Sequence, residues 1–118
     1  MSFEKSCLDI RLEPRYDCTV LLARARVDEG DEYVDAELFL DQGITNDNGR
    51  FSRDSSSFTE SAENIHLEFR DDGVWLIADL WDHLRRHIER QAINLSEHIE
   101  NQDGDLDFLI GGINQSYK

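Results

Sequence analysis

Residues 79–99 read DLWDHLRRHIERQAINLSEHI and decide the fold class that the sequence predicts. From Leu80 onward, apolar residues recur every three or four positions, as they do along one face of an amphipathic helix. The members of this stripe are Leu80, Trp81, Leu84, Ile88, Ala92, Leu95 and Ile99. Asp79 is placed to act as the N-cap, and Gly104 marks the expected stop. Roughly 20 residues at 1.5 Å each predict a helix about 30 Å long, enough to cross a sheet.

Strand patterns fill the chain before this helix. The apolar residues between positions 8 and 12 alternate with charged residues, and a period of two indicates a half-buried strand. The next apolar run, 18–27, is expected to fold back so that Leu12 faces Cys18. Asp72-Gly73 is read as a two-residue turn between two later strands. These two strands are expected at residues 65–69 and 74–78, another at 34–40, and a last one after the helix at 106–110.

Together these elements predict one domain over residues 1–118, of the α+β class. It would be an antiparallel sheet of about five to six strands, with the long C-terminal amphipathic helix packed on one face. Residues 41–63 are rich in Ser, Asn, Asp and Gly, and they read as a mobile loop or as a short hairpin turning at Asn48-Gly49. The tail, 111–118, is expected to fray. No internal repeat is evident.

The composition is strongly acidic. Of the 118 residues, 26 are Asp or Glu and 12 are Lys or Arg, which gives a formal net charge of −14. Such a surface repels nucleic-acid backbones and anionic lipid. No apolar run is long enough to span a membrane and no secretory leader is recognisable, so a cytoplasmic protein is predicted. Cys7 and Cys18 lack metal-site spacing and are expected to be reduced and buried.

The densest acidic stretch predicts a partner-binding patch that would attract a basic protein by complementary potential. Its residues are Asp28, Glu29, Asp31, Glu32, Asp35 and Glu37. By size and charge the chain is like small acidic proteins that neutralise basic toxins, nucleases or nucleic-acid-binding proteins. The first prediction is therefore a non-catalytic inhibitor or immunity-type antagonist, with a nucleic-acid charge mimic as a variant of it.

A second hypothesis explains the same composition by salt. An Asp-rich, Lys-poor surface stays soluble where salt screens charge repulsion, so the chain also fits a self-assembling structural or small-ligand-binding domain from a salt-adapted cell, with a homodimer among its forms. Neither hypothesis involves catalysis or a cofactor. The sequence has no nucleophile elbow, no phosphate-binding glycine loop and no metalloprotease motif, so an enzyme is not expected.

Two clusters are weak candidates for a metal. Asp103, Asp105 and Asp107 alternate around Gly104, and three carboxylates of this kind suit a hard cation such as Ca²⁺. A Ca²⁺-binding module is therefore a third hypothesis. His83 and His87 are four residues apart on the predicted helix, the spacing of helical metal pairs. For both clusters the competing interpretation is a solvated surface, with an acidic turn in the first case and a basic helix flank in the second.

Overall fold

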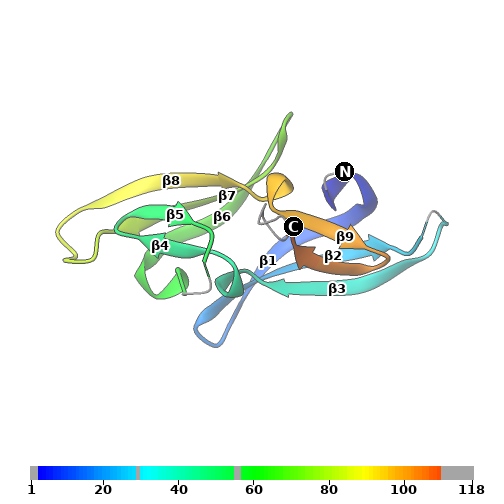
Figure 1. The fold of residues 1–118 in the computed structure, drawn as a ribbon, viewed down its shortest axis with the longest axis horizontal. Coiled ribbons are helices and arrows are strands. Elements are labelled where there is room, and N and C mark those ends of the chain that lie inside the picture. The colour runs from blue at the N-terminus through cyan, green and yellow to red at the C-terminus, as the bar shows by residue number, and fades with distance from the viewer. Residues whose placement is uncertain (1–2, 29, 55–56, 110–118) are drawn as a thin grey trace, which may run out of the picture.

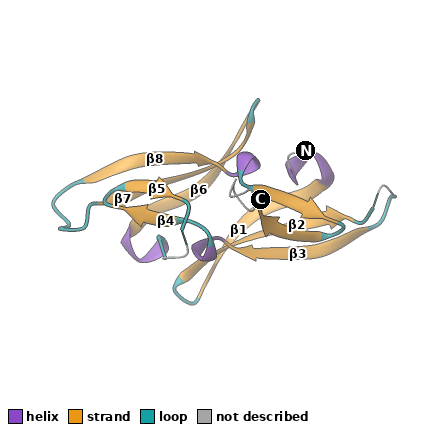
Figure 2. Ribbon diagram, viewed as in Figure 1, coloured by secondary structure: helices purple, strands orange, loops and turns teal. Residues whose placement is uncertain are grey.

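The structured part of the chain is almost entirely β. The computed structural model describes residues 3–28, 30–54 and 57–109. Within them lie two three-stranded antiparallel sheets and two two-stranded hairpins (Figure 1, Figure 2). The first sheet has the order β1 (Cys7–Arg15), β2 (Cys18–Arg26), β3 (Tyr33–Phe39), and the second has the order β6 (Ala62–Arg70), β7 (Gly73–Trp81), β8 (Ile88–Asn94). The hairpins are β4 (Thr45–Asp47) with β5 (Arg50–Ser52), and β9 (Ile99–Gln102) with β10 (Asp105–Phe108).

The helical elements within the described ranges are short 3-10 turns. They are η1 (Phe3–Ser6), η2 (Leu40–Gln42), η3 (Thr59–Ser61) and η4 (Leu95–Glu97). None of the helices in this part of the chain is long and apolar enough to cross a membrane.

The second half of the molecule repeats the first at a constant offset along the sequence. One and the same shift carries the bounds of β1, β2, β3 and η2 onto those of β6, β7, β8 and η4. The sequence carries this repeat weakly, because LDQGITNDNG at 40–49 and LSEHIENQDG at 95–104 share only Leu, Ile, Asn and Gly at equivalent places. The reading that the chain has no internal repeat is therefore wrong. The two halves share their backbone conformation but few identical residues.

Each hairpin packs on the sheet of the other half. β5 contacts β8 of the second sheet, whereas β10 contacts β3 of the first. Figure 1 shows the result: β4 and β5 lie beside β6–β8 at one end of the elongated molecule, and β9 lies beside β1–β3 at the other. Each three-stranded sheet is therefore packed against a hairpin from the other half of the sequence.

One hydrophobic core joins the two halves. Its largest fully buried side chains come in pairs that occupy equivalent positions of the two repeats. The pairs are Phe3 with Phe58, Leu21 with Leu76, Leu40 with Leu95, and Ile44 with Ile99. Burying a side chain of this size contributes about 1.5–3 kcal/mol, so the two repeats stabilise the core with matched contributions.

Two equivalent asparagines attach the exchanged hairpins to their sheets. In β4, the Asn46 side-chain amide donates to Ser61 Oγ at 2.8 Å and to the carbonyl of Trp81 at 2.8 Å, while its Oδ1 accepts from the Gly49 N–H at 2.7 Å. The equivalent bonds in β9 run from Asn101 to Ser6 Oγ at 2.9 Å and the Arg26 carbonyl at 3.1 Å, and from the Gly104 N–H to Asn101 at 2.9 Å. Each asparagine thus shapes its own turn and binds a distant strand.

The long helix predicted for residues 80–99 is absent, so the α+β prediction is wrong. This segment contains the end of β7, a turn at 82–87, β8, η4 and the start of β9. A helix would turn Leu84 and Ile88 toward the core, but these residues are 55% and 39% exposed. Asp79 lies in β7, where its carboxylate binds Arg90 of β8 at 3.1 Å instead of capping a helix. Strand pairing on both sides of β7 overrides the weaker local signal of helical spacing.

The strands were predicted better than their registers. Leu12 pairs with Leu21 and not with Cys18, because the β1–β2 turn contains only Tyr16 and Asp17. Tyr16 accommodates this tight turn with a φ of 59°. The β6–β7 turn likewise falls one residue earlier than expected, at 71–72.

The sequence predicted two further segments, 41–63 and 111–118, to be irregular. Residues 41–63 contain the β4–β5 hairpin, which turns at Asn48-Gly49, and the 3-10 turn η3. The tail expected to fray, 111–118, lies outside the described residues.

Replacing either hairpin asparagine should destabilise the fold by a similar amount. Asn46→Ala and Asn101→Ala each remove hydrogen bonds from a strand carbonyl, a hydroxyl and a turn N–H, at an expected cost of about 2–3 kcal/mol. Chemical denaturation measures the change in unfolding free energy. The control is Gln102→Ala, whose exposed amide bonds only to Glu100 of its own strand, with an expected change below about 0.5 kcal/mol. An asparagine variant as stable as this control would contradict the role given to Asn46 and Asn101 in attaching the hairpins.

Gly73→Ala should also destabilise the protein. Gly73 has a φ of +144°, and a Cβ there would lie 2.5 Å from Asn94 Oδ1 and 2.8 Å from Ser96 Oγ. Both oxygens already accept hydrogen bonds, from the Ser96 and Val74 N–H groups at 3.0 Å each, so they cannot retreat freely. The expected loss is about 2–3 kcal/mol. Thermal melts should show a clear drop relative to Gly30→Ala, where a Cβ meets only a carbonyl oxygen at 3.9 Å; equal melting temperatures would show that the site relaxes.

Candidate functional site

A cleft of about 300 Å³ opens where the β4–β5 and β7–β8 turns meet. Figure 1 shows these two turns at the same end of the molecule. The cleft is lined by Asn48, Gly49 and Arg50 from the β4–β5 hairpin, by Leu80 and Asp82 from the end of β7 and the residue after it, and by His87 and Glu89 at the beginning of β8. Polar side chains therefore surround a hollow that has one buried leucine in its wall.

The two turns are tied together by Asn48. This residue and Gly49 adopt φ values of 52° and 94°, as a two-residue hairpin turn requires. The side-chain oxygen of Asn48 accepts from the backbone N–H of His83 at 3.1 Å and lies 2.6 Å from His83 Nδ1. These contacts hold the walls of the cleft in place before any ligand arrives.

Asp82 closes the β7–β8 turn from inside. Its Oδ1 accepts from the backbone N–H groups of Arg86 at 2.8 Å and His87 at 3.4 Å. The Arg86 hydrogen bond is the largest cause that lowers the pKa of Asp82 below its ordinary value, so this carboxyl is ionised at neutral pH. Asp82 is thus both a structural acceptor for the turn and a negative group in the cleft wall.

Arg50 and Glu89 provide the free polar groups of the cleft. Both are exposed, and neither side chain has a hydrogen-bond or ion-pair partner among the described residues. A guanidinium donates and a carboxylate accepts, so the cleft offers both functions to a ligand with many hydroxyl groups. Its lining includes no Ser, Thr or Cys side chain that could attack a substrate.

The opposite end of the molecule has the same backbone and different charge. Asp103 Oδ1 accepts from the Asp28 N–H at 2.7 Å, as Asn48 accepts from His83, and Asp103 has a φ of 57°. A side-chain hydrogen bond with Asp103, and then its negative charge, raise the pKa of Asp28. The other equivalences between the repeats place Asp105 where the cleft has Arg50, Asp31 where it has Arg86, and Glu32 where it has His87.

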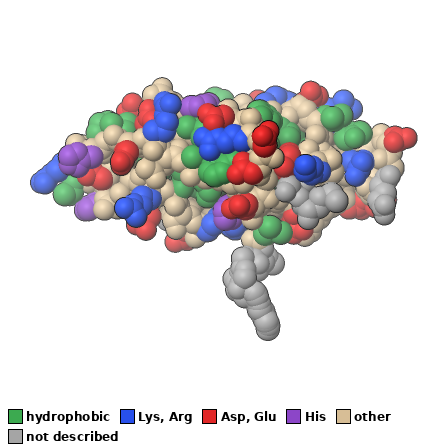
Figure 3. All heavy atoms as spheres, turned by 90° about the horizontal axis from the view of Figure 1, so that it is seen from above, with side chains coloured by type: hydrophobic (Ala, Val, Ile, Leu, Met, Phe, Trp, Pro, Cys, Tyr) green, Lys and Arg blue, Asp and Glu red, His purple; other side chains and the backbone are tan. Residues whose placement is uncertain are grey.

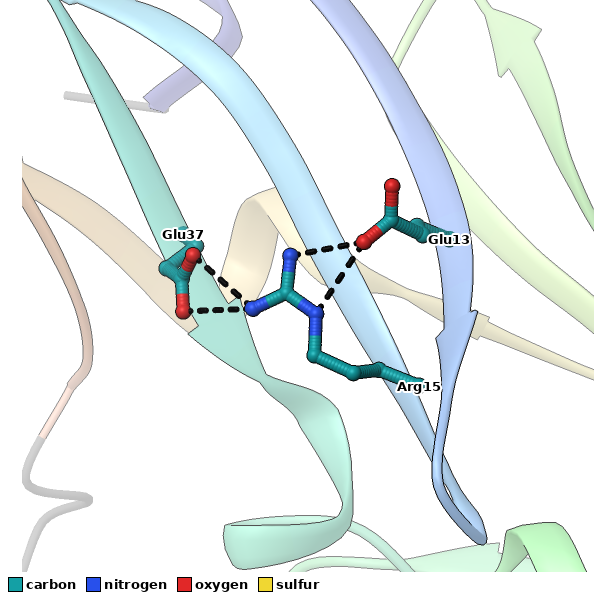
Figure 4. A network of polar contacts seen from close by, with 3 residues as sticks. All are labelled: Glu13, Arg15 and Glu37. Carbon is teal, nitrogen blue, oxygen red and sulfur yellow. Dashed lines mark hydrogen bonds and ion pairs between the residues drawn. The ribbon is translucent and has the colours of Figure 1, made fainter.

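The described members of the predicted acidic patch lie on the β2–β3 connection and on the adjoining strand β3. Asp28, Asp31 and Glu32 lie in the β2–β3 connection, Asp35 and Glu37 lie on β3, and Glu29 lies outside the described residues. Arg15 binds both oxygens of Glu37 at 2.9 and 3.0 Å and also binds Glu13 (Figure 4). Glu37 is therefore engaged within its own sheet.

The candidate metal ligands are also dispersed. His83 and His87 lie in a turn and not on one helix face, and His83 Nδ1 is beside the Asn48 oxygen. Asp103 binds the neighbouring backbone, whereas Asp105 and Asp107 are exposed on β10. Across residues 3–28, 30–54 and 57–109, no group of three or more His, Cys, Asp or Glu side chains is arranged to hold a metal ion.

Both cysteines are free thiols. Cys7 is buried, and desolvation raises its pKa to about 11, so it is an unreactive neutral thiol. Cys18 is only half-buried, at the β1–β2 turn.

Sequence reasoning missed most of the cleft. Asn48-Gly49 was recognised as a turn and His87 as half of a metal pair, but Arg50 and Glu89 carried no visible signal. The usable signal was a second hairpin turn, Asp103-Gly104, at the equivalent place in the second half of the sequence. That repeat would have placed two equivalent hairpin ends in the molecule and drawn attention to the residues around each.

Known proteins resemble this chain over nearly its whole described length. The model of the CVNH domain family matches residues 3–107. A Cyanovirin-N homolog of Neurospora crassa is 37% identical over 109 residues, which cover 90% of this chain and 96% of that protein. The solved structure of the CVNH protein of Gibberella zeae is 38% identical with a TM-score of 0.78, covering 91% of this chain and 96% of that one. Microvirin, solved in complex with mannobiose, is 28% identical with a TM-score of 0.77, covering 92% and 98%.

These likenesses overturn the prediction of an acidic inhibitor, immunity protein or DNA mimic with a basic protein partner. That prediction came from net charge, which specifies neither a fold nor a site. Microvirin, one of the similar proteins solved with a ligand, is in complex with a saccharide and not with a basic protein. Because the family model spans both repeats, and the relatives from Neurospora crassa and Gibberella zeae match nearly the whole sequence, the chain belongs to the CVNH-domain family of cyanovirin-N homologs.

Proposed function

We propose that this chain binds a saccharide without transforming it, and that its ligand site is the cleft between the β4–β5 and β7–β8 turns. The observation that carries the proposal is the lining of that cleft, where an unpaired guanidinium and an unpaired carboxylate, among the described residues, face the same hollow. The complex of microvirin with mannobiose supports the choice of ligand class.

The hydroxyl groups of a saccharide match this lining. Each hydroxyl donates one hydrogen bond and accepts others, so Glu89 and Asp82 can accept from the ligand while Arg50 donates to it. A hydrogen bond to a charged group contributes about 1.5–3 kcal/mol when it is well made. The Asn48–His83 contacts hold the two turns together beforehand, which lowers the entropy lost on binding.

The lowered pKa of Asp82 argues against this carboxyl as the acid of a glycoside hydrolase. Cleavage of a glycosidic bond needs one carboxyl that keeps its proton in order to donate it. Backbone hydrogen bonds lower the pKa of Asp82 instead of raising it, so Asp82 has no proton to give near neutral pH. The chain is accordingly proposed as a non-catalytic member of its family.

Glu89→Ala should weaken binding of mannobiose about tenfold, the factor expected for one lost hydrogen bond to a charged acceptor. Isothermal titration calorimetry measures the dissociation constant. Asp17→Ala is the control, because Asp17 is an exposed acid on the β1–β2 turn and does not line the cleft. This control should bind as the unmodified protein does, and both variants should keep their melting temperatures.

An NMR titration tests where on the molecule the saccharide binds. In a ¹⁵N NMR titration with mannobiose, the amides of residues 48–50 and 82–89 should shift most. Shifts confined to the β2–β3 end would place the site elsewhere. The absence of any shift at millimolar mannobiose and with a panel of neutral oligosaccharides would refute saccharide binding.

A further inference from the structure

The two equivalent ends of the molecule differ most in charge. Around the cleft, the β7–β8 turn carries Arg85 and Arg86 together with two histidines, and β5 adds Arg50. Figure 3 shows Arg and His side chains, with some Asp or Glu among them, at this end, which is the end of the β7–β8 turn in Figure 1. The opposite end has Asp or Glu at four of the five equivalent positions and glycine at the fifth. The cleft end also holds Asp47, Asp82 and Glu89, so its charge is mixed, whereas the opposite end is acidic.

Two of these arginines are available to a ligand. Within the described residues, the Arg50 and Arg86 side chains form no hydrogen bond or ion pair, whereas Arg85 donates to the Glu60 carbonyl at 3.2 Å. Some arginines elsewhere are used within the fold, as Arg15 and Arg90 are in their ion pairs. The Arg50 and Arg86 guanidinium groups therefore have no counter-ion in the part of the chain that the structure describes.

The cleft also contains negative groups, and their positions decide which parts of a ligand each wall can bind. Asp82 directs Oδ1 to two backbone N–H groups, which offset part of its field. Glu89 enters from β8, whereas Arg50 enters from β5. Asp47 is exposed in β4 next to the turn. A ligand can thus meet a cation on the β5 wall and a hydroxyl acceptor on the β8 wall.

On this basis, and resting on the function proposed above, we infer that the cleft prefers a saccharide that carries an anionic group, a carboxylate, sulfate or phosphate, and that Arg50 binds this group. The planar guanidinium presents two parallel N–H donors, which match the two oxygens of such a group. Glu89 and Asp82 then accept from the ligand's neutral hydroxyls. The acidic opposite end repels the same ligand, so each chain binds one molecule of it.

The test compares two disaccharides of one linkage, mannobiose and dimannuronate, which differ in that the second carries a carboxylate on each ring. Calorimetry at low salt should show dimannuronate binding about fivefold more tightly, with one site per chain, the factor expected for one exposed ion pair. At about 0.5 M NaCl this preference should shrink toward one, while the affinity for mannobiose changes little, because salt screens only the charged contact.

Variants assign the preference to a residue. Arg50→Gln should bring the ratio of the two affinities close to one, and Arg50→Lys should keep most of the preference because it keeps the charge. Glu89→Gln should raise the ratio, since it removes an opposing charge from the cleft. Arg24→Gln, on an exposed position of β2 in the other sheet, changes the net charge by the same amount and should leave the ratio unaltered.

The outcomes separate this inference from the proposal beneath it. Equal affinities for the two disaccharides, tighter binding of mannobiose, or a preference that survives Arg50→Gln would each overturn the inference while leaving saccharide binding intact. Binding of neither disaccharide would overturn the proposed function and this inference together. A second dimannuronate per chain would overturn the assignment to one end.

Discussion

The fold depends on the exchange of hairpins between the two repeats. Each three-stranded sheet packs against a β-hairpin from the other half of the sequence, and one asparagine per hairpin attaches it. Asn46 and Asn101 bind carbonyls of strands that are far away in the sequence, at Trp81 and Arg26, so these contacts are non-local. A core of paired residues then forms across both halves. Because each half supplies what the other lacks, the cleft at one end exists only when both halves are folded together.

Duplication also explains how one molecule presents two different ends. The backbone is repeated down to the left-handed residues of the turns, Asn48-Gly49 and Asp103-Gly104. Those turns need only a few residue types, which leaves the exposed positions around them unconstrained by the fold. At one end the exposed positions include arginine and histidine as well as acids, and at the other they hold mainly aspartate and glutamate. The same scaffold thus supports a mixed-charge cleft at one end and an acidic pair at the other, where Asp28 has a raised pKa.

The failed prediction of a helix shows how two signals compete in one stretch of sequence. The apolar residues of 80–99 do recur at helical spacing. Leu80 and Leu95 are both buried, but they belong to different elements, β7 and η4. The turn between them is built by Asp82, whose carboxylate accepts from backbone N–H groups four and five residues later. A carboxylate that caps a turn and one that caps a helix look alike in sequence. Only the pairing of β7 with strands on both sides distinguishes them.

By itself, the sequence determined the local features: strands with period-two alternation, the Asn48-Gly49 turn, and an acidic surface. These follow from steric and solvation preferences that act over a few residues, so they can be read from neighbours in the chain. Strand registers, the pairing of the two repeats and the meeting of Arg50 with Glu89 were decided only by tertiary structure. The physical reason is that those contacts join distant segments whose free energy comes from shared burial and from hydrogen bonds across the exchanged hairpins. Net charge, the most visible feature of the sequence, is compatible with many folds, and the site depends on how a few exposed charges are placed by the turns that carry them.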